Sequence, residues 1–197
     1  MIENLITRTL TGQGDSDQHT LTLFSLALNI KAKNILELGV RDGGTTEPLL
    51  LAVSILGGHL DSVDINDCNV SFTSDLKNFW TFHKEDAIKF LKNNTKKYDL
   101  IYLDDWHSYE HVKTELELIS HFADKNTVIL LHDLMGNGSH PNYATNIPGG
   151  TLYPQYNTQG SEWYGGGPYR AVSELNLDVW EWATIPVNHG LTLLRKK

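Results

Sequence analysis

Residues 34–46 constrain the fold of this chain more than any other segment. They contain a short apolar strand pattern that ends at Leu38, a turn with glycines at positions 39, 43 and 44, and two threonines that begin a helix pattern. Glycine lets the backbone approach a ligand closely, and the first turn of a helix presents N–H groups without a partner in the helix. A strand, turn and helix of this kind bind nucleotide-like molecules at the carboxyl edge of a parallel sheet. We therefore expect a ligand site at this turn.

The rest of the chain alternates strand patterns with helix patterns, which predicts a doubly wound α/β sheet. Thr46-Glu47-Pro48 has the capping hydroxyl, early acid and early proline of a helix start. The last two strand-like runs, 179–185 and 191–194, are joined by a short turn and predict a β-hairpin. The other strands are expected at 34–38, 60–65, 79–82, 98–103 and 127–131, and helices at 18–30, 46–56, 87–92, 109–122 and 170–175.

The bulk properties favour one domain that covers residues 1–197. The chain has a formal net charge of −8 and a single cysteine, so an internal disulfide and a cysteine metal cluster are excluded. The acidic charge disfavours nucleic acid and anionic membranes as partners. No apolar run approaches the roughly 18 residues of a membrane span, and the N-terminus lacks a signal-peptide layout. We expect a cytoplasmic protein, and leave a homo-oligomer open.

Residues 136–168 interrupt the alternation. This segment is rich in glycine and contains several tyrosines and a tryptophan. A loop of this length in a compact domain is commonly a lid or a binding loop, and its aromatic side chains could close over a substrate and exclude water. We therefore predict a substrate lid, with a disordered or crystal-ordered insertion as the alternative.

The spacing of the glycines distinguishes between cofactors. A dinucleotide-binding turn needs G-x-G-x-x-G, whereas this chain has Arg41 where the second glycine would stand. The pattern E-x-G-x-x-x-G-G-T resembles motif I of the class I S-adenosylmethionine (SAM) methyltransferases, whose Rossmann-like α/β fold has a seven-stranded, mostly parallel sheet. The resemblance implies that the turn passes under the methionine part of SAM and that Glu37 lies near its amino end. The cofactor contacts predicted on this segment are Glu37, Gly39, Arg41, Gly43 and Thr45.

Acids at the ends of the next two strands support the same cofactor. Asp64 ends the second strand, where a carboxylate can accept two hydrogen bonds from ribose hydroxyls. Asp86 follows the third strand and resembles the family residue that faces the adenine amino group, although it could instead cap the helix from Ala87. The neighbours Ile65 and Ala87 complete the predicted cofactor contacts here.

Three further polar residues are expected to converge. Asp104 ends the fourth strand, which neighbours the first at the switch point of such a sheet, and His132 and Asp133 end the fifth strand. Two carboxylates and an imidazole suit Mg²⁺, Mn²⁺ or a softer divalent metal. We therefore predict a metal site of Asp104, His132 and Asp133, with Asp104 also near the cofactor. The alternative is that His132 only donates a hydrogen bond to Asp104.

The segment from Glu37 to Asp133 resembles the metal-dependent O-methyltransferases of the catechol and caffeoyl-CoA type, and the broader family of cephalosporin hydroxylase-like and macrolide-sugar O-methyltransferases. In that broader family the fourth strand often ends in D-x-D-H-S-Y-E, and the matching run here, residues 104–110, reads D-D-W-H-S-Y-E, with Trp106 in place of the second aspartate. The resemblance implies that His107 stands where catechol-type enzymes place a lysine base. A histidine, with a pKa near 6.5, can take a hydroxyl proton at neutral pH. We predict His107 and Asp104 as catalytic residues; His107 could alternatively only orient the following helix.

These features predict a SAM-dependent methyltransferase that transfers a methyl group to an oxygen of a small molecule or sugar, assisted by a divalent metal. Nitrogen stays open as the acceptor atom. One alternative is a non-catalytic protein of the same fold that binds SAM or S-adenosylhomocysteine (SAH). The other is an NAD-type oxidoreductase, which the glycine spacing disfavours.

Overall fold

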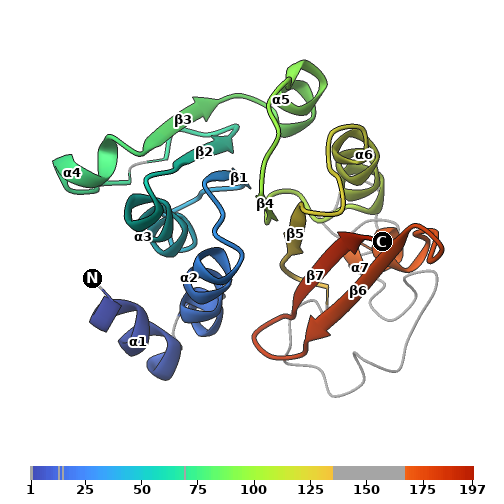
Figure 1. Cartoon of the computed structure of the whole chain (residues 1–197). Helices are drawn as coiled ribbons and strands as arrows, with labels where there is room; N and C mark the ends of the chain where they lie inside the picture. Colours follow the sequence, from blue (N-terminus) through green and yellow to red (C-terminus); the bar gives the residue numbers. More distant parts are fainter. Residues whose placement is uncertain (1, 13, 15, 69, 135–166) are drawn as a thin grey trace.

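The computed structural model describes residues 2–134 and 167–197, with the exception of 13, 15 and 69. Within these residues, seven strands form one sheet in the order β3-β2-β1-β4-β5-β7-β6 (Figure 1). The pairs from β3 to β5 are parallel, whereas β7 runs antiparallel to both β5 and β6. The predicted α/β fold, a mostly parallel sheet that ends in an antiparallel hairpin, is confirmed.

The elements lie close to their predicted positions. The strands are β1 (Asn34–Leu38), β2 (His59–Asp64), β3 (Trp80–Lys84), β4 (Leu100–Leu103), β5 (Val128–Leu131), β6 (Trp180–Ile185) and β7 (Leu191–Lys196). The predicted helices correspond to α2 (Thr20–Asn29), α3 (Thr46–Leu56), α5 (Ala87–Asn93), α6 (Tyr109–Ser120) and α7 (Gly167–Ser173). The predicted lid falls almost entirely on residues 135–166, outside the described residues.

Three short elements are absent from the sequence prediction. They are α1 (Ile2–Thr11), the 3₁₀ turn η1 (Asp17–His19) and α4 (Ser74–Lys77). Each buries a single side chain, namely Leu5, His19 and Leu76. The two shortest, η1 and α4, have three and four residues and leave almost no apolar periodicity to detect. Helix α1 does have apolar residues at helical spacing, Ile2, Leu5, Ile6 and Leu10, and the prediction overlooked them.

Helices cover both faces of the sheet (Figure 1). On one face, side chains of α1 to α4 form a core with Ile35, Leu60 and Tyr102. On the other face, α5, α6 and α7 pack on Leu36, Ile101 and other strand residues. All four residues of β4 are buried, as expected for a strand covered on both sides. Because helices cover both faces, a ligand can bind the sheet only at the ends of these central strands.

The turn after β1 brings two strand ends into contact. Gly39 has a φ of 88°, a conformation that residues with a Cβ rarely adopt. A Cβ at this position would lie 2.1 Å from the backbone carbonyl oxygen of Asp104. Glycine is therefore required here for the end of β1 to approach the end of β4.

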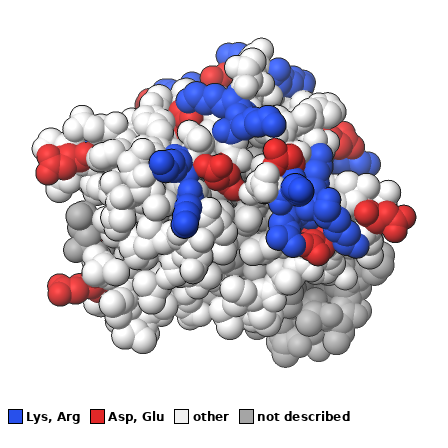
Figure 2. Space-filling view, in the orientation of Figure 1, with Lys and Arg blue, Asp and Glu red and all other residues white. Residues whose placement is uncertain are grey.

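The surface carries charges of both signs. On the face drawn in Figure 2, lysine and arginine side chains form separate patches beside aspartate and glutamate side chains. That face has no continuous basic stripe of the kind that follows a nucleic-acid backbone. Among the described residues, no helix combines the length and the hydropathy that crossing a bilayer requires.

Candidate functional site

A cavity of about 780 Å³ opens at the carboxyl edge of the sheet. The glycine turn, the ends of β2 to β5 and the turn between β6 and β7 bound it. Its volume falls within the range of small-molecule and cofactor sites. It also lies at the switch point of the sheet, where ligands bind in doubly wound folds.

Most of the predicted cofactor residues line this cavity. They are Gly39, Arg41, Thr45, Asp64, Ile65, Asp86, Ala87 and Asp104. Glu37 and Gly43 are not among the lining residues. Gly43 instead shapes the turn, with a φ of 81° and no room for a Cβ, which would lie 2.6 Å from Cγ1 of Val70.

Glu37 is fully buried beneath the turn, and three hydroxyl groups hold its carboxylate. Ser62 donates at 2.6 Å, Thr45 at 2.7 Å and Thr46 at 2.8 Å. Burial raises the pKa of Glu37 to about 7, although these hydroxyl donors oppose the shift. The carboxylate therefore ties β1 to β2 and to the start of α3.

The predicted capping role of the Thr46 hydroxyl is wrong. Helix α3 has Thr45 at its N-cap, and that side chain makes no capping hydrogen bond. Both threonine hydroxyls donate to Glu37. A buried carboxylate needs donors more than a helix end does, because the helix end can reach water or a ligand.

The backbone of the glycine turn orients Asp64. Its Oδ2 accepts the N–H groups of Val40 at 2.9 Å and Arg41 at 3.1 Å, and its Oδ1 accepts that of Asn66 at 2.8 Å. Although burial acts in the opposite direction, these amide donors hold the pKa of Asp64 below its usual value. Each carboxylate oxygen has two lone pairs, so Oδ1 of Asp64 retains one that can accept a hydrogen bond from a ligand in the cavity.

Asp86 shows both roles left open by the sequence, and Arg41 lies at the mouth of the same cavity. Asp86 caps α5 by accepting the N–H of Lys89 at 2.8 Å, and it also lines the cavity. Arg41 has a left-handed backbone with a φ of 49°, and its side chain is 68% exposed at the cavity mouth. Both residues therefore combine a local structural role with access to a ligand.

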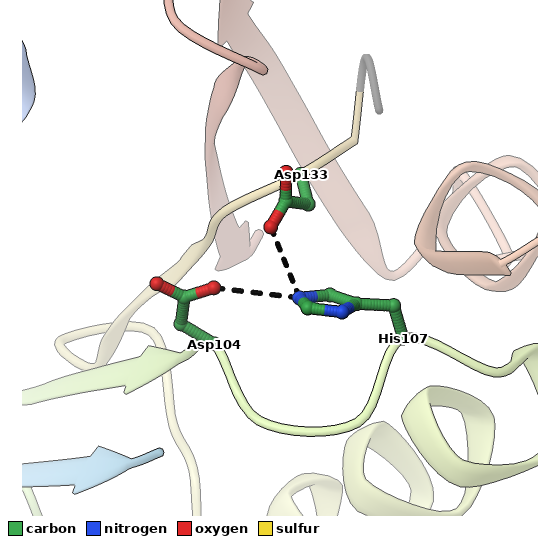
Figure 3. A group of neighbouring side chains, drawn as sticks. All are labelled: Asp104, His107 and Asp133. Atoms are coloured by element: carbon green, nitrogen blue, oxygen red, sulfur yellow. Dashed lines mark hydrogen bonds and ion pairs between the residues drawn. The ribbon is translucent and has the colours of Figure 1, made fainter. Parts of the chain in front are cut away.

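A compact group of three polar side chains lines the cavity at the ends of β4 and β5 (Figure 3). It consists of Asp104, His107 and Asp133 and is here named the β4–β5 cluster. Nε2 of His107 lies 3.4 Å from Oδ1 of Asp104 and 3.0 Å from Oδ2 of Asp133. One potential ligand atom from each residue lies within 4.8 Å of the others. The predicted base therefore lies among the predicted metal carboxylates.

Asp133 reaches the cluster through an unusual backbone conformation. Its φ is 63°, in the left-handed region where residues other than glycine are uncommon. Such conformations concentrate at functional sites, where the surrounding structure imposes them. Here the left-handed residue lies two positions after the end of β5 and places its carboxylate beside His107.

His132 has one nitrogen whose role is fixed by its partner. Its Nε2 lies 3.0 Å from the carbonyl oxygen of Asn188, which can only accept, so Nε2 carries the proton. Its Nδ1 lies 3.1 Å from Asp133 and 3.5 Å from Asp104, yet it is buried and makes no hydrogen bond to any described residue. This nitrogen must hold either a second proton or a cation between itself and the carboxylates.

The electrostatics of the group show how strongly a positive charge is favoured. Burial alone would lower the pKa of His132, but Asp104 and Asp133 raise it to about 10. In turn His132 and His107 hold the pKa of Asp104 well below its usual range, against the effect of burial. Carboxylates with an adjacent imidazole nitrogen also match the donor preferences of divalent metals. The residues present therefore fit the predicted metal.

The structure adds residues that the sequence analysis missed. Nδ1 of His189, in the β6–β7 turn, lies 3.5 Å from Oδ1 of Asp133. The hydroxyl of Tyr102 donates to Oδ2 of Asp104 at 2.9 Å. The turn containing His189 is visible in the sequence, but its position beside β5 follows only from the β5–β7 pairing.

The described residues that line the cavity are strongly acidic. They include eight carboxylates and one arginine, Arg41, with three histidines. A low-dielectric cleft lined by one sign of charge attracts ligands of the opposite sign. The cavity therefore suits a ligand with cationic groups better than one with a diphosphate.

Comparisons with known proteins agree with this geometry. A family profile described as "Methyltransferase domain" matches residues 36–134, which is half of the chain and spans the strands that bound the cavity. A polyamine aminopropyltransferase from Alkaliphilus metalliredigens is 36% identical over 88 residues. That match covers 40% of this chain and only 30% of the relative's length.

Solved structures share the fold over nearly the whole chain. An SAH-bound methyltransferase from Podospora anserina superposes with a TM-score of 0.61 at 16% identity, over 98% of this chain and 87% of that one. An O-methyltransferase from Bacillus cereus in complex with SAH gives a TM-score of 0.62 at 16% identity, over 99% and 90%. The chain belongs to the methyltransferase domain family and has the Rossmann-like fold of the class I O-methyltransferases.

Proposed function

We propose that this chain transfers the methyl group of SAM to an oxygen of a small molecule or sugar, with a divalent metal at the end of β4 and β5. One observation carries the proposal. Most of the predicted cofactor residues and the β4–β5 cluster face the same acidic cavity, at the switch point of a methyltransferase fold.

The charge of the cavity supports SAM over a dinucleotide. SAM carries a sulfonium and an ammonium group, whereas NAD carries an anionic diphosphate. With eight carboxylates and one arginine on its described lining, the cavity would repel the diphosphate. In this proposal Asp64 accepts a hydrogen bond from a ribose hydroxyl, Asp86 faces the adenine, and the Gly39 turn passes under the methionine part.

The two histidines near Asp104 have different roles in this proposal: His132 binds the metal and His107 acts as the base. Because the Asn188 carbonyl holds the proton on Nε2 of His132, the Nδ1 lone pair is directed at the carboxylates and is available to a metal. Asp104, His132 and Asp133 would hold that metal, which would act as a Lewis acid that lowers the pKa of the acceptor hydroxyl. His107 is then left as the base.

The transfer itself needs few groups. Nε2 of His107 takes the proton of the acceptor hydroxyl, and Asp104 and Asp133 stabilise the imidazolium that results. The acceptor oxygen forms a new bond to the methyl carbon as the carbon–sulfur bond breaks, and the sulfur retains the electron pair, so neutral SAH leaves. Alignment of oxygen, carbon and sulfur supplies much of the rate.

Calorimetry and turnover together test this proposal. The binding of SAH is measured with and without Mg²⁺ or Mn²⁺, and SAH release from SAM is followed with vicinal diols, phenols, sugars and amines as acceptors. We expect Asp64→Asn to lose SAH binding, and His107→Gln to bind SAH while turnover falls by roughly 100-fold or more. His132→Gln should lose the metal, and His121→Gln, an exposed histidine, should behave like the wild type.

The outcomes separate the alternatives. SAH binding without turnover on any acceptor would support a non-catalytic protein of this fold. Methylated amines as the only products would replace oxygen by nitrogen as the acceptor atom. Binding of NAD⁺ without SAH would overturn the cofactor assignment.

A further inference from the structure

A second group of metal-ligand side chains lies next to the first. Asp105 follows Asp104 in the chain, and His111 and Glu115 stand one turn apart on α6. Nε2 of His111 lies 2.9 Å from Oδ2 of Asp105 and 3.5 Å from Oε1 of Glu115. One potential ligand atom from each residue lies within 4.8 Å of the others. We name this group the α6 cluster.

Glu115 is the unusual member. Its side chain is 0% exposed, and neither carboxylate oxygen has a hydrogen-bond partner among the described residues. The single Nε2–H of His111 can be directed at only one acceptor, and the shorter contact is to Asp105. A buried carboxylate with a charged neighbour at 3.5 Å but no hydrogen bond is strongly disfavoured, so a proton or a cation is expected at this point.

A proton or a cation could supply that charge. Burial and the nearby charge of Asp105 raise the pKa of Glu115 to about 8, against the effect of His111. If His111 is an imidazolium between two carboxylates, the buried group still has a net charge of −1. The net charge becomes zero either with a proton on Glu115 or with a divalent cation in place of the Nε2 proton, a neutral imidazole and both carboxylates. The cation would in addition give Asp105, His111 and Glu115 one shared partner.

We propose that Asp105, His111 and Glu115 form a second divalent-cation site, separate from the β4–β5 cluster and selective for a transition metal such as Zn²⁺ or Mn²⁺. Two carboxylate oxygens and one imidazole nitrogen are the donor types that these ions accept. Asp105 and His111 also line the large cavity, which gives the ion an entry path. The proposal concerns binding alone and stands whether or not the chain transfers methyl groups.

The site would have a positioning role. Asp105 lies in the loop between β4 and α6, which also carries Asp104 and His107, whereas Glu115 lies in the middle of α6. A cation that joins them would fix this loop against the helix. It would thereby hold Asp104 and His107 in place without touching a substrate.

Metal stoichiometry tests the proposal without any activity assay. Metal-stripped protein is dialysed against Zn²⁺ or Mn²⁺, and the bound metal is counted by elemental analysis. An Asp104→Asn, Asp133→Asn double variant removes the first cluster, and we expect it to retain one equivalent. Adding Glu115→Gln to that background should weaken the remaining site by roughly 100-fold or more. Glu117→Gln, which removes an exposed acid from the same helix, should have no effect.

Thermal unfolding provides a second, independent measurement. Without metal, Glu115→Gln should be at least as stable as the wild type, because it removes a buried charge. With metal, only proteins that keep Glu115 should gain stability through the α6 cluster. If Glu115→Gln fails to fold, Asp105→Asn, which changes a partly exposed residue, should abolish the same equivalent. The proposal is overturned if the double variant binds no metal or if the Glu115 or Asp105 variants retain it.

Discussion

Glu37 shows how a residue with the signature of a ligand site can serve the fold. Its carboxylate lies at the end of a strand in a ligand-binding motif, but it is fully buried and accepts three hydroxyl donors. Burial raises the pKa of Glu37 from 4.5 to about 7. The folded protein is therefore more stable when this side chain is protonated than when it is ionised.

This shift predicts the effect of Glu37→Gln on the pH dependence of stability. The pKa of Glu37 is higher in the folded state, so the wild type is favoured at low pH and loses this contribution as pH rises through about 7. The variant has no such group. We expect the free energy of unfolding of the wild type, relative to Glu37→Gln, to fall by about 2.5 kcal/mol between pH 5 and pH 8.5.

Denaturant unfolding at the two pH values measures the difference. Glu110→Gln, which changes an exposed acid, serves as the control and should follow the wild type. An equal pH dependence for wild type and Glu37→Gln would show that Glu37 is ionised in both states.

At the scale of elements, the β6–β7 hairpin completes the site. Its turn has positive φ at Asn188, His189 and Gly190, and its carbonyl oxygens face two buried histidines. Asn188 accepts from His132, and Val187 accepts from His19 at 2.9 Å. The turn thus connects η1 near the N-terminus with β5 and with the β4–β5 cluster.

His19→Leu should therefore loosen this turn. His19 is buried, and burial together with the nearby His132 lowers its pKa, so it acts as a neutral donor. Loss of the donor removes one hydrogen bond from the Val187 carbonyl, which still accepts the N–H of Gly190, so the expected cost is that of one hydrogen bond, about 0.5–1.5 kcal/mol. Urea unfolding should show this loss, and hydrogen exchange should be faster at residues 187–190. His121→Leu, at an exposed position, should show neither effect; a stable His19→Leu protein with an unchanged turn would contradict the prediction.

At the scale of the whole molecule, the cavity depends on segments distant in sequence. The turn after β1, the ends of β2 to β5 and His189 all line it. A ligand bound there would connect both halves of the sheet. Its binding energy would therefore appear as resistance of the entire chain to unfolding.

SAH should raise the melting temperature as a consequence. At 100 times its dissociation constant, a ligand that binds only the folded state adds about 2.7 kcal/mol, which corresponds to about 5–10 °C for a chain of this size. Differential scanning fluorimetry measures the shift. Asp64→Asn should show little shift at the same SAH concentration, and NAD⁺ should give none with the wild type. A shift with NAD⁺ but not with SAH would contradict the cofactor proposal.

Much of the fold could be predicted because its signals are local. Apolar runs identify the buried strands, Gly57 ends α3 in a left-handed conformation, and the β-hairpin follows from two strand patterns around a short turn. The order of the strand ends also follows from doubly wound topology, so the convergence of Asp104 with His132 and Asp133 could be expected. These features depend on periodicity and on topology, and both are properties of the linear sequence.

The partners of the polar side chains had to come from the three-dimensional packing. The sequence around Glu37 is the same whether its carboxylate contacts SAM or three hydroxyl groups. The sequence around His107 likewise fits a residue that orients a helix and one that lies between two carboxylates. His189 lies beside Asp133 only because β7 pairs with β5. That the buried carboxylate of Glu115 lacks a hydrogen bond within the described residues is known only from the packing around it. Strand register and long-range packing determine these distances and the local dielectric, and both together determine whether a carboxylate binds a ligand, a proton or a metal.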